Sequence, residues 1–169
     1  MHFRPDSPHI ALLPPSIPSA AAVINGPLAL GLRAYRARDY WGAFLHWKLL
    51  ADRRDDEGLF LVGTMYALGH GVKQNLPVAL DLLTDGTARG NSRAAFNAAM
   101  VGMRIDMPAP KLLAYLRLAA ESIDDSLIVE RCHRVAQAVG KALSPEQHEA
   151  VRRMMSEIMA QGRAALESS

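Results

Sequence analysis

A unit of two helix-length segments recurs along this chain and limits its fold more than any other feature. When residues 58–89 are placed over the segments that follow, Phe60 aligns with Phe96 and Gly63 with Ala99. The period lies in the mid-thirties, and a single pair of helices cannot bury its own apolar face, so such units stack and share one core. The repeat therefore predicts a short α-solenoid of antiparallel helix hairpins.

The segments after Pro27 have the pattern of helices, and no run alternates in the way a half-buried strand would. Alanine and leucine dominate, and unbranched side chains lose little rotamer freedom in a helix. Ser144, Pro145 and Gln147 match a capping box with proline in the first turn. We expect an all-α fold of about eight helices: two that meet near Arg38 and Asp39, helices over about 58–68, 76–89, 92–103 and 111–122, one capped by Asp124, and one opened by Ser144.

The glycines between Gly63 and Gly71 raise the question of a phosphate-binding loop. Such a loop needs a strand before the glycines and a helix directly after them, so that backbone N–H groups point at the anion. Here a helix precedes them, and their spacing matches no phosphate-binding motif. We interpret Gly63 as a point where two helices approach closely, and Gly69 and Gly71 as turn residues.

The stretch GLFLVGTMYALGHGVKQNLPVALDLLTDGTARGNSRAAF resembles a Sel-one-like repeat, a relative of the tetratricopeptide repeat. The resemblance lies in Gly63 and Tyr66 in the first helix, followed by the turn GHGV. Asn75 then stands where the family usually has aspartate, and Ala79 and Gly90 follow in the second half.

The similarity covers roughly residues 29–161 and weakens after this central unit. Ala99 replaces the helix glycine, Gly102 stands where a tyrosine is usual, and RIDMPAP replaces the Gly-x-Gly turn. The resemblance implies a Sel-one-like repeat α-solenoid over residues 28–169, ended by a C-terminal capping helix. It also implies a role in binding other proteins.

Residues 1–27 form a proline-rich, apolar arm in front of the repeats. Six of the ten prolines lie here, which excludes a long helix. Ile10, Leu12 and Leu13 are among its apolar residues. Two interpretations stay open: an unstructured tail, or an extended segment that packs along a groove of this protein or along a partner.

Charge and composition exclude several classes of protein. The formal net charge of +2, from 19 Lys and Arg against 17 Asp and Glu, gives no concentrated basic surface for a nucleic acid. The single cysteine, Cys132, permits no intrachain disulfide and suits a reducing compartment. No apolar run is long enough to form a transmembrane segment. We expect a cytoplasmic protein, the alternatives being a periplasmic protein or one associated with a membrane through the arm.

No set of residues predicts catalysis, a cofactor or a metal site. The six histidines include no pair at i and i+4, and no carboxylate or cysteine completes a set at ligand spacing. Cys132 and His133 are adjacent on one expected helix, about 100° apart, and do not converge on one reacting atom. The alternative is a small hydrolase on the same scaffold, because some cysteine-rich members of the family have been described as hydrolases. The paired cysteines of those members are missing here.

The resemblance implies that the first helix of each unit lines a concave side that contacts a partner. Methionine suits an adaptable binding surface, and an asparagine such as Asn97 can clamp the backbone of a bound peptide. For Asn97 a structural bond to a neighbouring turn is the alternative, and for Phe96, Met100 and Met103 a place in the core. The predicted partner-binding residues are Phe60, Thr64, Ala67, Phe96, Asn97, Met100 and Met103 on the repeats, with Ile10, Leu12 and Leu13 on the arm.

The last helix carries a broad apolar stripe between Val151 and Leu166. This stripe either seals the end of the stack or receives a second copy of the chain, which would make a homo-oligomer. The chain as a whole is predicted to be a non-enzymatic adaptor or an accessory subunit of a larger complex. Its partner is another protein or a peptide, bound through the concave face and the arm.

Overall fold

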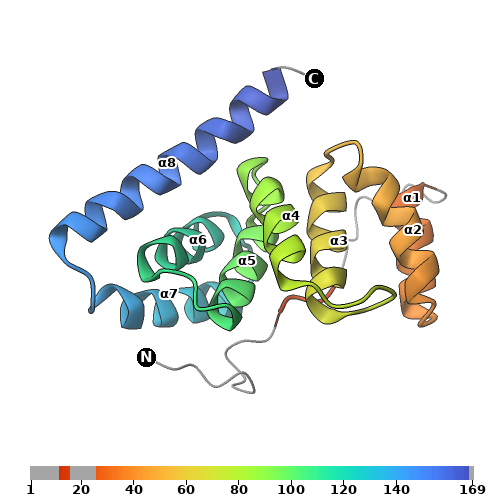
Figure 1. Ribbon diagram of the computed structural model, residues 1–169, viewed down its shortest axis with the longest axis horizontal. Helices are drawn as coiled ribbons and strands as arrows, with labels where there is room; N and C mark the ends of the chain where they lie inside the picture. Colours follow the sequence, from red (N-terminus) through yellow and green to blue (C-terminus); the bar gives the residue numbers. More distant parts are fainter. Residues whose placement is uncertain (1–11, 16–25, 168–169) are drawn as a thin grey trace.

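The computed structural model describes residues 12–15 and 26–167, and within those ranges it contains α-helices and no strand. Up to residue 140, consecutive helices run antiparallel and stand side by side as hairpins (Figure 1). The expected all-α array of about eight helices is confirmed. The helices are α1 (Pro27–Arg36), α2 (Tyr40–Ala51), α3 (Asp56–Leu68), α4 (Leu76–Ala88), α5 (Ser92–Arg104), α6 (Ala109–Ser122), α7 (Ser126–Gly140) and α8 (Pro145–Glu167).

Side-chain caps set most of the helix starts. Ser144 and Gln147 form the expected reciprocal pair, in which the Ser144 backbone N–H donates to Gln147 Oε1 at 2.9 Å. The predicted cap of α7 was wrong by one residue. Asp125, and not Asp124, has the extended backbone of a cap, and its carboxylate accepts from the backbone N–H of Leu127 at 2.9 Å.

The caps of α3 and α5 repeat with the period of the hairpins. The Asp55 carboxylate accepts from the Gly58 N–H at 2.8 Å, and the Asn91 side-chain oxygen accepts from the Ala94 N–H at 3.0 Å. Asp55 and Asn91 hold equivalent positions in consecutive hairpins, so the same local signal starts the first helix of each.

The glycines between α3 and α4 act as joints and turn residues. A Cβ atom on Gly63 would lie 2.9 Å from Leu83 Cγ, so the missing side chain lets α3 and α4 approach closely. Gly69 (φ 75°) and Gly71 (φ 71°) adopt left-handed backbone conformations, and a side chain on Gly71 would collide with the carbonyl of Tyr40.

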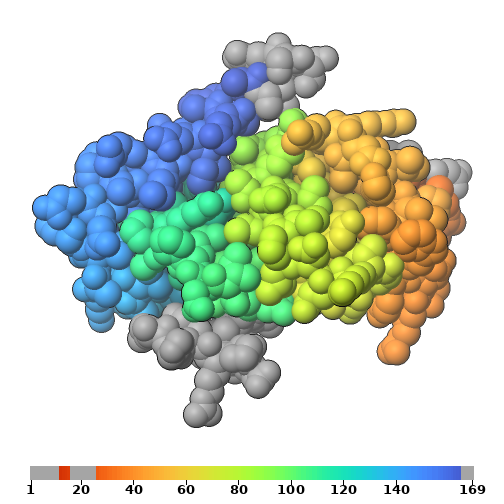
Figure 2. All heavy atoms as spheres, in the orientation of Figure 1, coloured from red at the N-terminus to blue at the C-terminus, as the bar shows by residue number. Residues whose placement is uncertain are grey.

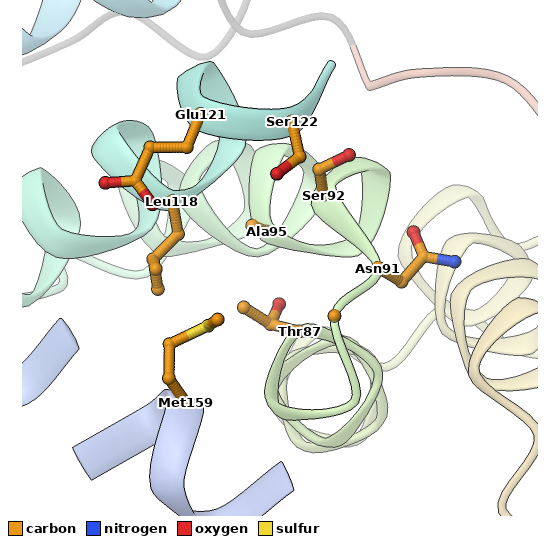
Figure 3. Close-up of a pocket in the computed structure, with 9 residues that line it drawn as sticks. Thr87, Asn91, Ser92, Ala95, Leu118, Glu121, Ser122 and Met159 are labelled. Atoms are coloured by element: carbon orange, nitrogen blue, oxygen red, sulfur yellow. The ribbon is translucent and has the colours of Figure 1, made fainter. Parts of the chain in front are cut away.

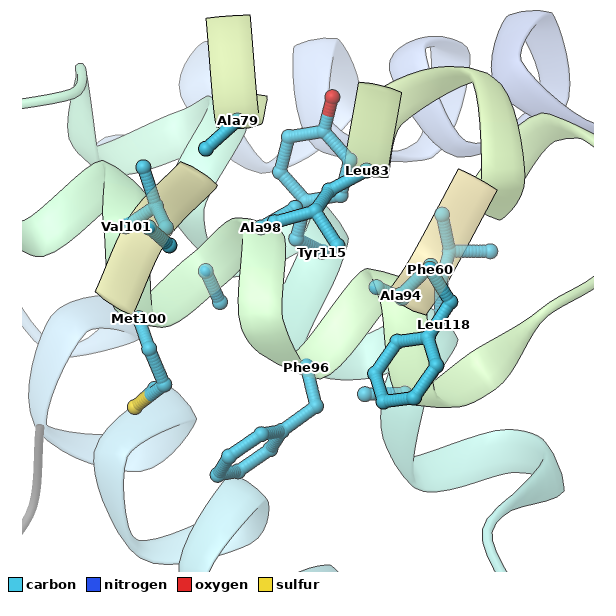
Figure 4. Close-up of a cluster of buried hydrophobic side chains, with 14 of the residues drawn as sticks. Phe60, Ala79, Leu83, Ala94, Phe96, Ala98, Met100, Val101, Tyr115 and Leu118 are labelled. Carbon is cyan, nitrogen blue, oxygen red and sulfur yellow. The ribbon is translucent and has the colours of Figure 1, made fainter. Parts of the chain in front are cut away.

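The core runs continuously between the hairpins. Side chains from α3, α4, α5 and α6 meet in one buried cluster, with Leu83 and Tyr115 on the sides of α4 and α6 that face α5 (Figure 4). The Tyr115 hydroxyl pairs with the Thr84 hydroxyl at 2.7 Å, which satisfies the polar end of an otherwise buried ring. Neighbouring units therefore supply the apolar contacts that one hairpin lacks.

α8 does not continue the stack as its next layer. It turns back and makes its main contacts with α6 and α4 (Figures 1 and 2). Val151 is fully buried, and Gly162 presses against the carbonyl of Ala88 at the end of α4, where any Cβ would overlap. The expected terminal cap therefore covers the second helices of the central hairpins rather than the end of the stack. None of the helices in the described ranges combines the length and apolar content needed to cross a membrane.

Candidate protein-binding site

The Asn97 side chain on α5 holds the backbone of the arm by two hydrogen bonds. Its Oδ1 accepts from the Leu13 N–H at 2.7 Å, and its Nδ2 donates to the Leu13 carbonyl at 3.0 Å. The two residues lie 84 positions apart in the chain. A pair of such bonds contributes about 1–3 kcal/mol net, since each replaces a bond to water. We call the Asn97 and Thr64 side chains, which together hold the Leu13 backbone, the Asn97 clamp.

Thr64 on α3 fixes the orientation of the Asn97 amide. The Thr64 hydroxyl donates to the Phe60 carbonyl at 2.7 Å, so its oxygen is left to accept, and it accepts from Asn97 Nδ2 at 2.9 Å. The NH2 group must therefore face Thr64, which turns Oδ1 toward the Leu13 N–H. Both Thr64 and Asn97 are fully buried and fully hydrogen-bonded.

The arm segment has no regular secondary structure, bends at Pro15 and suits a site that offers few acceptors. Leu12 and Leu13 are half-buried against the core, Pro14 is exposed and Pro15 is buried. Pro14 and Pro15 have no N–H group, so Leu13 carries the single backbone donor of residues 13–15, and Asn97 accepts it. Figure 1 shows this short stretch crossing the array on the side away from α8. Ile10, the other arm residue predicted to bind a partner, lies outside the described residues.

Phe60 and Phe96 sit at equivalent positions beneath arginine side chains. The Arg93 guanidinium lies 4.1 Å from the centre of the Phe60 ring, and that of Arg131 lies 5.1 Å from the centre of the Phe96 ring. Figure 4 shows Phe96 pointing away from α4. Both rings are fully buried. They therefore belong to the core, the alternative left open for Phe96, and the arginines lie over them.

The other predicted residues of this side are also largely covered. Met100 is fully buried, with its sulfur 3.6 Å from Arg131 Nη2, and Met103 is 7% exposed. Ala67 contributes its backbone: its carbonyl accepts from Arg104 at 3.1 Å and from Gln74 at 2.9 Å. Helical spacing places these residues on the inward stripe but does not separate core positions from positions that reach a ligand.

A partly buried ion pair lies beside Phe60. Arg93 Nη1 and Glu57 Oε1 are 2.8 Å apart, and both side chains are about one-fifth exposed. Burial raises the pKa of the Glu57 carboxyl, while the charge of Arg93 and the hydrogen bond from Asn91 act in the opposite direction. This pair ties the start of α5 to the start of α3 and orients the arginine over the ring.

The small cavity beside α8 offers little for catalysis. One cavity lies where α8 crosses the hairpins, lined by Thr87, Ser92, Glu121, Ser122 and Met159 among others (Figure 3). It holds about 40 Å³, far less than a drug-sized organic ligand requires. Two serine hydroxyls and one carboxylate line it, and no histidine or lysine.

Cys132, the residue that the hydrolase alternative would need, is fully buried in α7. Burial raises the pKa of its thiol to about 11, against the opposing charge of Arg131, so little thiolate exists at neutral pH. Among the described residues, histidine, cysteine and carboxylate side chains do not gather in threes as they would around a metal ion.

The structure also joins two residues that sequence reasoning did not pair. The Tyr35 hydroxyl lies 2.7 Å from His70 Nδ1, and the imidazole stacks on the Tyr40 ring with centroids 4.4 Å apart. Burial, and to a lesser extent Tyr40, raises the pKa of Tyr35 to about 12, which makes it a poor nucleophile. The contact ties α1 to the turn after α3 and gives His70 a structural role.

Comparison with known proteins supports the fold. No family model and no curated protein matches the chain. It is similar to a crystal structure of c5321, described as a protective antigen of uropathogenic Escherichia coli strains that displays an SLR fold. The TM-score is 0.67 at 16% identity, and the match covers 87% of this chain and 33% of that one, so this chain spans about a third of the length of c5321. The likeness agrees with the hairpins, glycine joints and repeated caps described above: the chain has the Sel-one-like repeat fold.

Proposed function

We propose that this protein is a non-enzymatic adaptor or accessory subunit that binds an extended segment of another protein against α3 and α5. The Asn97 clamp is the observation that carries the proposal. It holds a backbone through both its N–H and its carbonyl, and neither hydrogen bond involves the side chain that the backbone bears.

The geometry suits a peptide ligand better than a small molecule. An amide that offers one donor and one acceptor to the same residue matches the backbone of any extended chain. Thr64 holds this amide in the required orientation and is itself satisfied by the Phe60 carbonyl, so the site is formed in advance. The repeat fold adds a general expectation of protein binding, and the specific role rests on the clamp.

Peptide selection tests this function directly. Random 12-residue peptides displayed on phage are selected on the full-length protein, and the enriched peptides are measured by calorimetry. We expect extended, apolar sequences to bind. In a chain whose own arm is released by L12D/L13D, so that N97A acts on the incoming peptide alone, N97A should weaken them about 5- to 150-fold, the equivalent of about 1–3 kcal/mol.

A second buried asparagine gives the matched control. Asn91 caps α5 and donates to Asp56 Oδ2 at 3.1 Å and to Glu57 Oε2 at 3.2 Å, away from the clamp. N91S keeps a capping oxygen and loses those bonds, so it lowers stability and should leave peptide affinity unchanged. Equal losses in N97A and N91S, or no loss in N97A, would overturn the proposal.

A further inference from the structure

The stretch from Leu12 to Pro15 occupies the clamp that an incoming segment would need. The two Leu13 backbone groups use Oδ1 and one hydrogen of Nδ2, and Thr64 uses the other hydrogen. The NH2 group then has no hydrogen left for a second peptide in the same position. A segment from another protein can reach this amide only when Leu13 leaves it.

The bound stretch also shows which chemistry the site accepts. The two leucines contribute apolar surface against the core, and Pro15 is buried. The two prolines bring no N–H that would stay unpaired, and they hold the chain extended before it binds, which lowers the entropy lost on docking. An ordinary residue in place of Pro15 would bury a donor that needs an acceptor.

We infer that the α3–α5 surface recognises extended segments of two aliphatic residues followed by two prolines, and that residues 12–15 are its resident ligand, which a partner segment must displace. The inference rests on the proposed function, whose partner it specifies. Ten residues separate Pro15 from Gly26, so the arm rebinds as an intramolecular ligand at an effective concentration in the millimolar range. This competition excludes partner segments that bind weakly and admits those that bind strongly enough to displace the arm.

A peptide that copies the arm tests the inference on the full-length chain. The probe is a fluorescent, acetylated and amidated peptide of the sequence IALLPPSI, residues 10–17, measured by anisotropy. We expect it to bind the L12D/L13D variant at least about tenfold more tightly than the wild type, because an arm bound in nine molecules out of ten raises the apparent Kd by that factor. Adding N97A to that variant should weaken binding about tenfold or more.

Two peptide controls separate backbone from side-chain recognition. Methylation of the peptide nitrogen that corresponds to Leu13 removes the N–H and keeps the side chain. It should abolish the tighter binding to L12D/L13D. Replacement of both prolines by alanine should weaken binding several-fold, since it adds unpaired N–H groups and loosens the extended chain.

The wild-type chain supplies a measurement that needs no variant. With saturating peptide, hydrogen exchange of the Leu13 amide should accelerate at least tenfold while amides in the middle of α5 stay protected.

Three outcomes would contradict the inference. If the peptide binds the wild type and L12D/L13D with equal affinity, and N97A still weakens binding, then residues 12–15 are not a resident ligand, and the proposed function still stands. A wild-type dimer that dissociates on L12D/L13D would overturn intramolecular docking. If the IALLPPSI peptide binds none of the variants, the site does not recognise two aliphatic residues followed by two prolines. The peptides selected from the random library would then still test the proposed function.

Discussion

Residues 12–15 and helix α8 lie against opposite sides of the same array and are held there by different interactions (Figure 1). Residues 12–15 are fixed at α5 by two backbone hydrogen bonds to one side chain. α8 is fixed at α6 and α4 by packing, with Val151 fully buried and Gly162 against the Ala88 carbonyl. Hydrogen bonds to backbone groups can form with many sequences, because every residue except proline carries both groups. Close packing depends on the particular side chains at the contact. This difference is the reason for proposing the arm, and not α8, as the element that a partner segment displaces.

The sharpest way to break the arm contact is N97D. A carboxylate at this buried position has no hydrogen for the Leu13 carbonyl or for Thr64, so we expect a loss of about 3 kcal/mol in the free energy of unfolding at pH 7. Burial raises the pKa of the new carboxyl, so its protonated form, which can donate to Leu13, is favoured in the folded protein. The penalty should be smallest at pH values below the unfolded pKa and should grow as the pH rises through the folded one. Urea unfolding of the variant and the wild type at pH 4 and pH 7 measures this, and a pH-independent difference would contradict it.

The corresponding change at the other end is Gly162→Ala. In an open helix this substitution stabilises by about 0.5–1 kcal/mol, but here the added methyl overlaps the Ala88 carbonyl, and we expect a net loss of about 2 kcal/mol. Gly140→Ala is the matched control, because its Cβ would lie 3.6 Å from His148, an ordinary contact, and that variant should gain stability. Thermal unfolding of both variants measures whether each substitution raises or lowers the stability of the protein. A gain for Gly162→Ala would show that α8 is not held where it is described.

A smaller effect is expected for Thr64→Val, which keeps the shape and removes the hydroxyl. One Asn97 hydrogen loses its acceptor, and we expect a loss of about 1 kcal/mol together with faster exchange of the Leu13 amide. Thr87→Val is the control, since the buried Thr87 hydroxyl likewise bonds to the carbonyl four residues earlier, at 2.7 Å from Leu83 O. The difference in urea unfolding between the two variants isolates the bond to Asn97. If the two losses are equal, Thr64 does not orient the amide.

The smallest effect should come from Met159→Ala on α8. Met159 is 42% exposed and borders the small cavity over Thr87, so its truncation removes little buried surface and should cost about 0.5 kcal/mol. Val151→Ala, in the buried part of the same helix, should cost clearly more. Chemical denaturation of the pair compares the two positions, and a large loss at Met159 would mean that this side chain is packed more tightly than its exposure indicates.

Local patterns predicted the repeated hairpins well, because each signal acts within a few residues. Asp39 accepts from the Gly42 N–H at 2.9 Å, and the Ser144–Gln147 pair spans three positions. Gly69 ends α3 in the left-handed conformation that its sequence context indicates. The missed cap of α7 illustrates the limit: two aspartates stand side by side, and backbone geometry chose Asp125.

The candidate site was predictable only in part. Helical spacing placed Phe60 and Phe96 on one stripe with Asn97 beside it, but it did not show that Arg93 and Arg131 lie over the two rings. Nor could it decide between a tail and a docked arm, because the choice depends on whether a distant amide meets the Leu13 backbone. The role of these residues in binding a partner stays a prediction.

The sequence by itself determined the helices, most of their caps, the glycine joints and the hairpin repeat, since propensity, capping and turn conformation depend on neighbours within about four residues. Only the tertiary structure decided that α8 turns back over α6 and α4 and that Leu13 meets Asn97 across 84 positions. Those contacts depend on shape and on hydrogen-bond partners that come together after the array has formed. No periodicity along the chain encodes them.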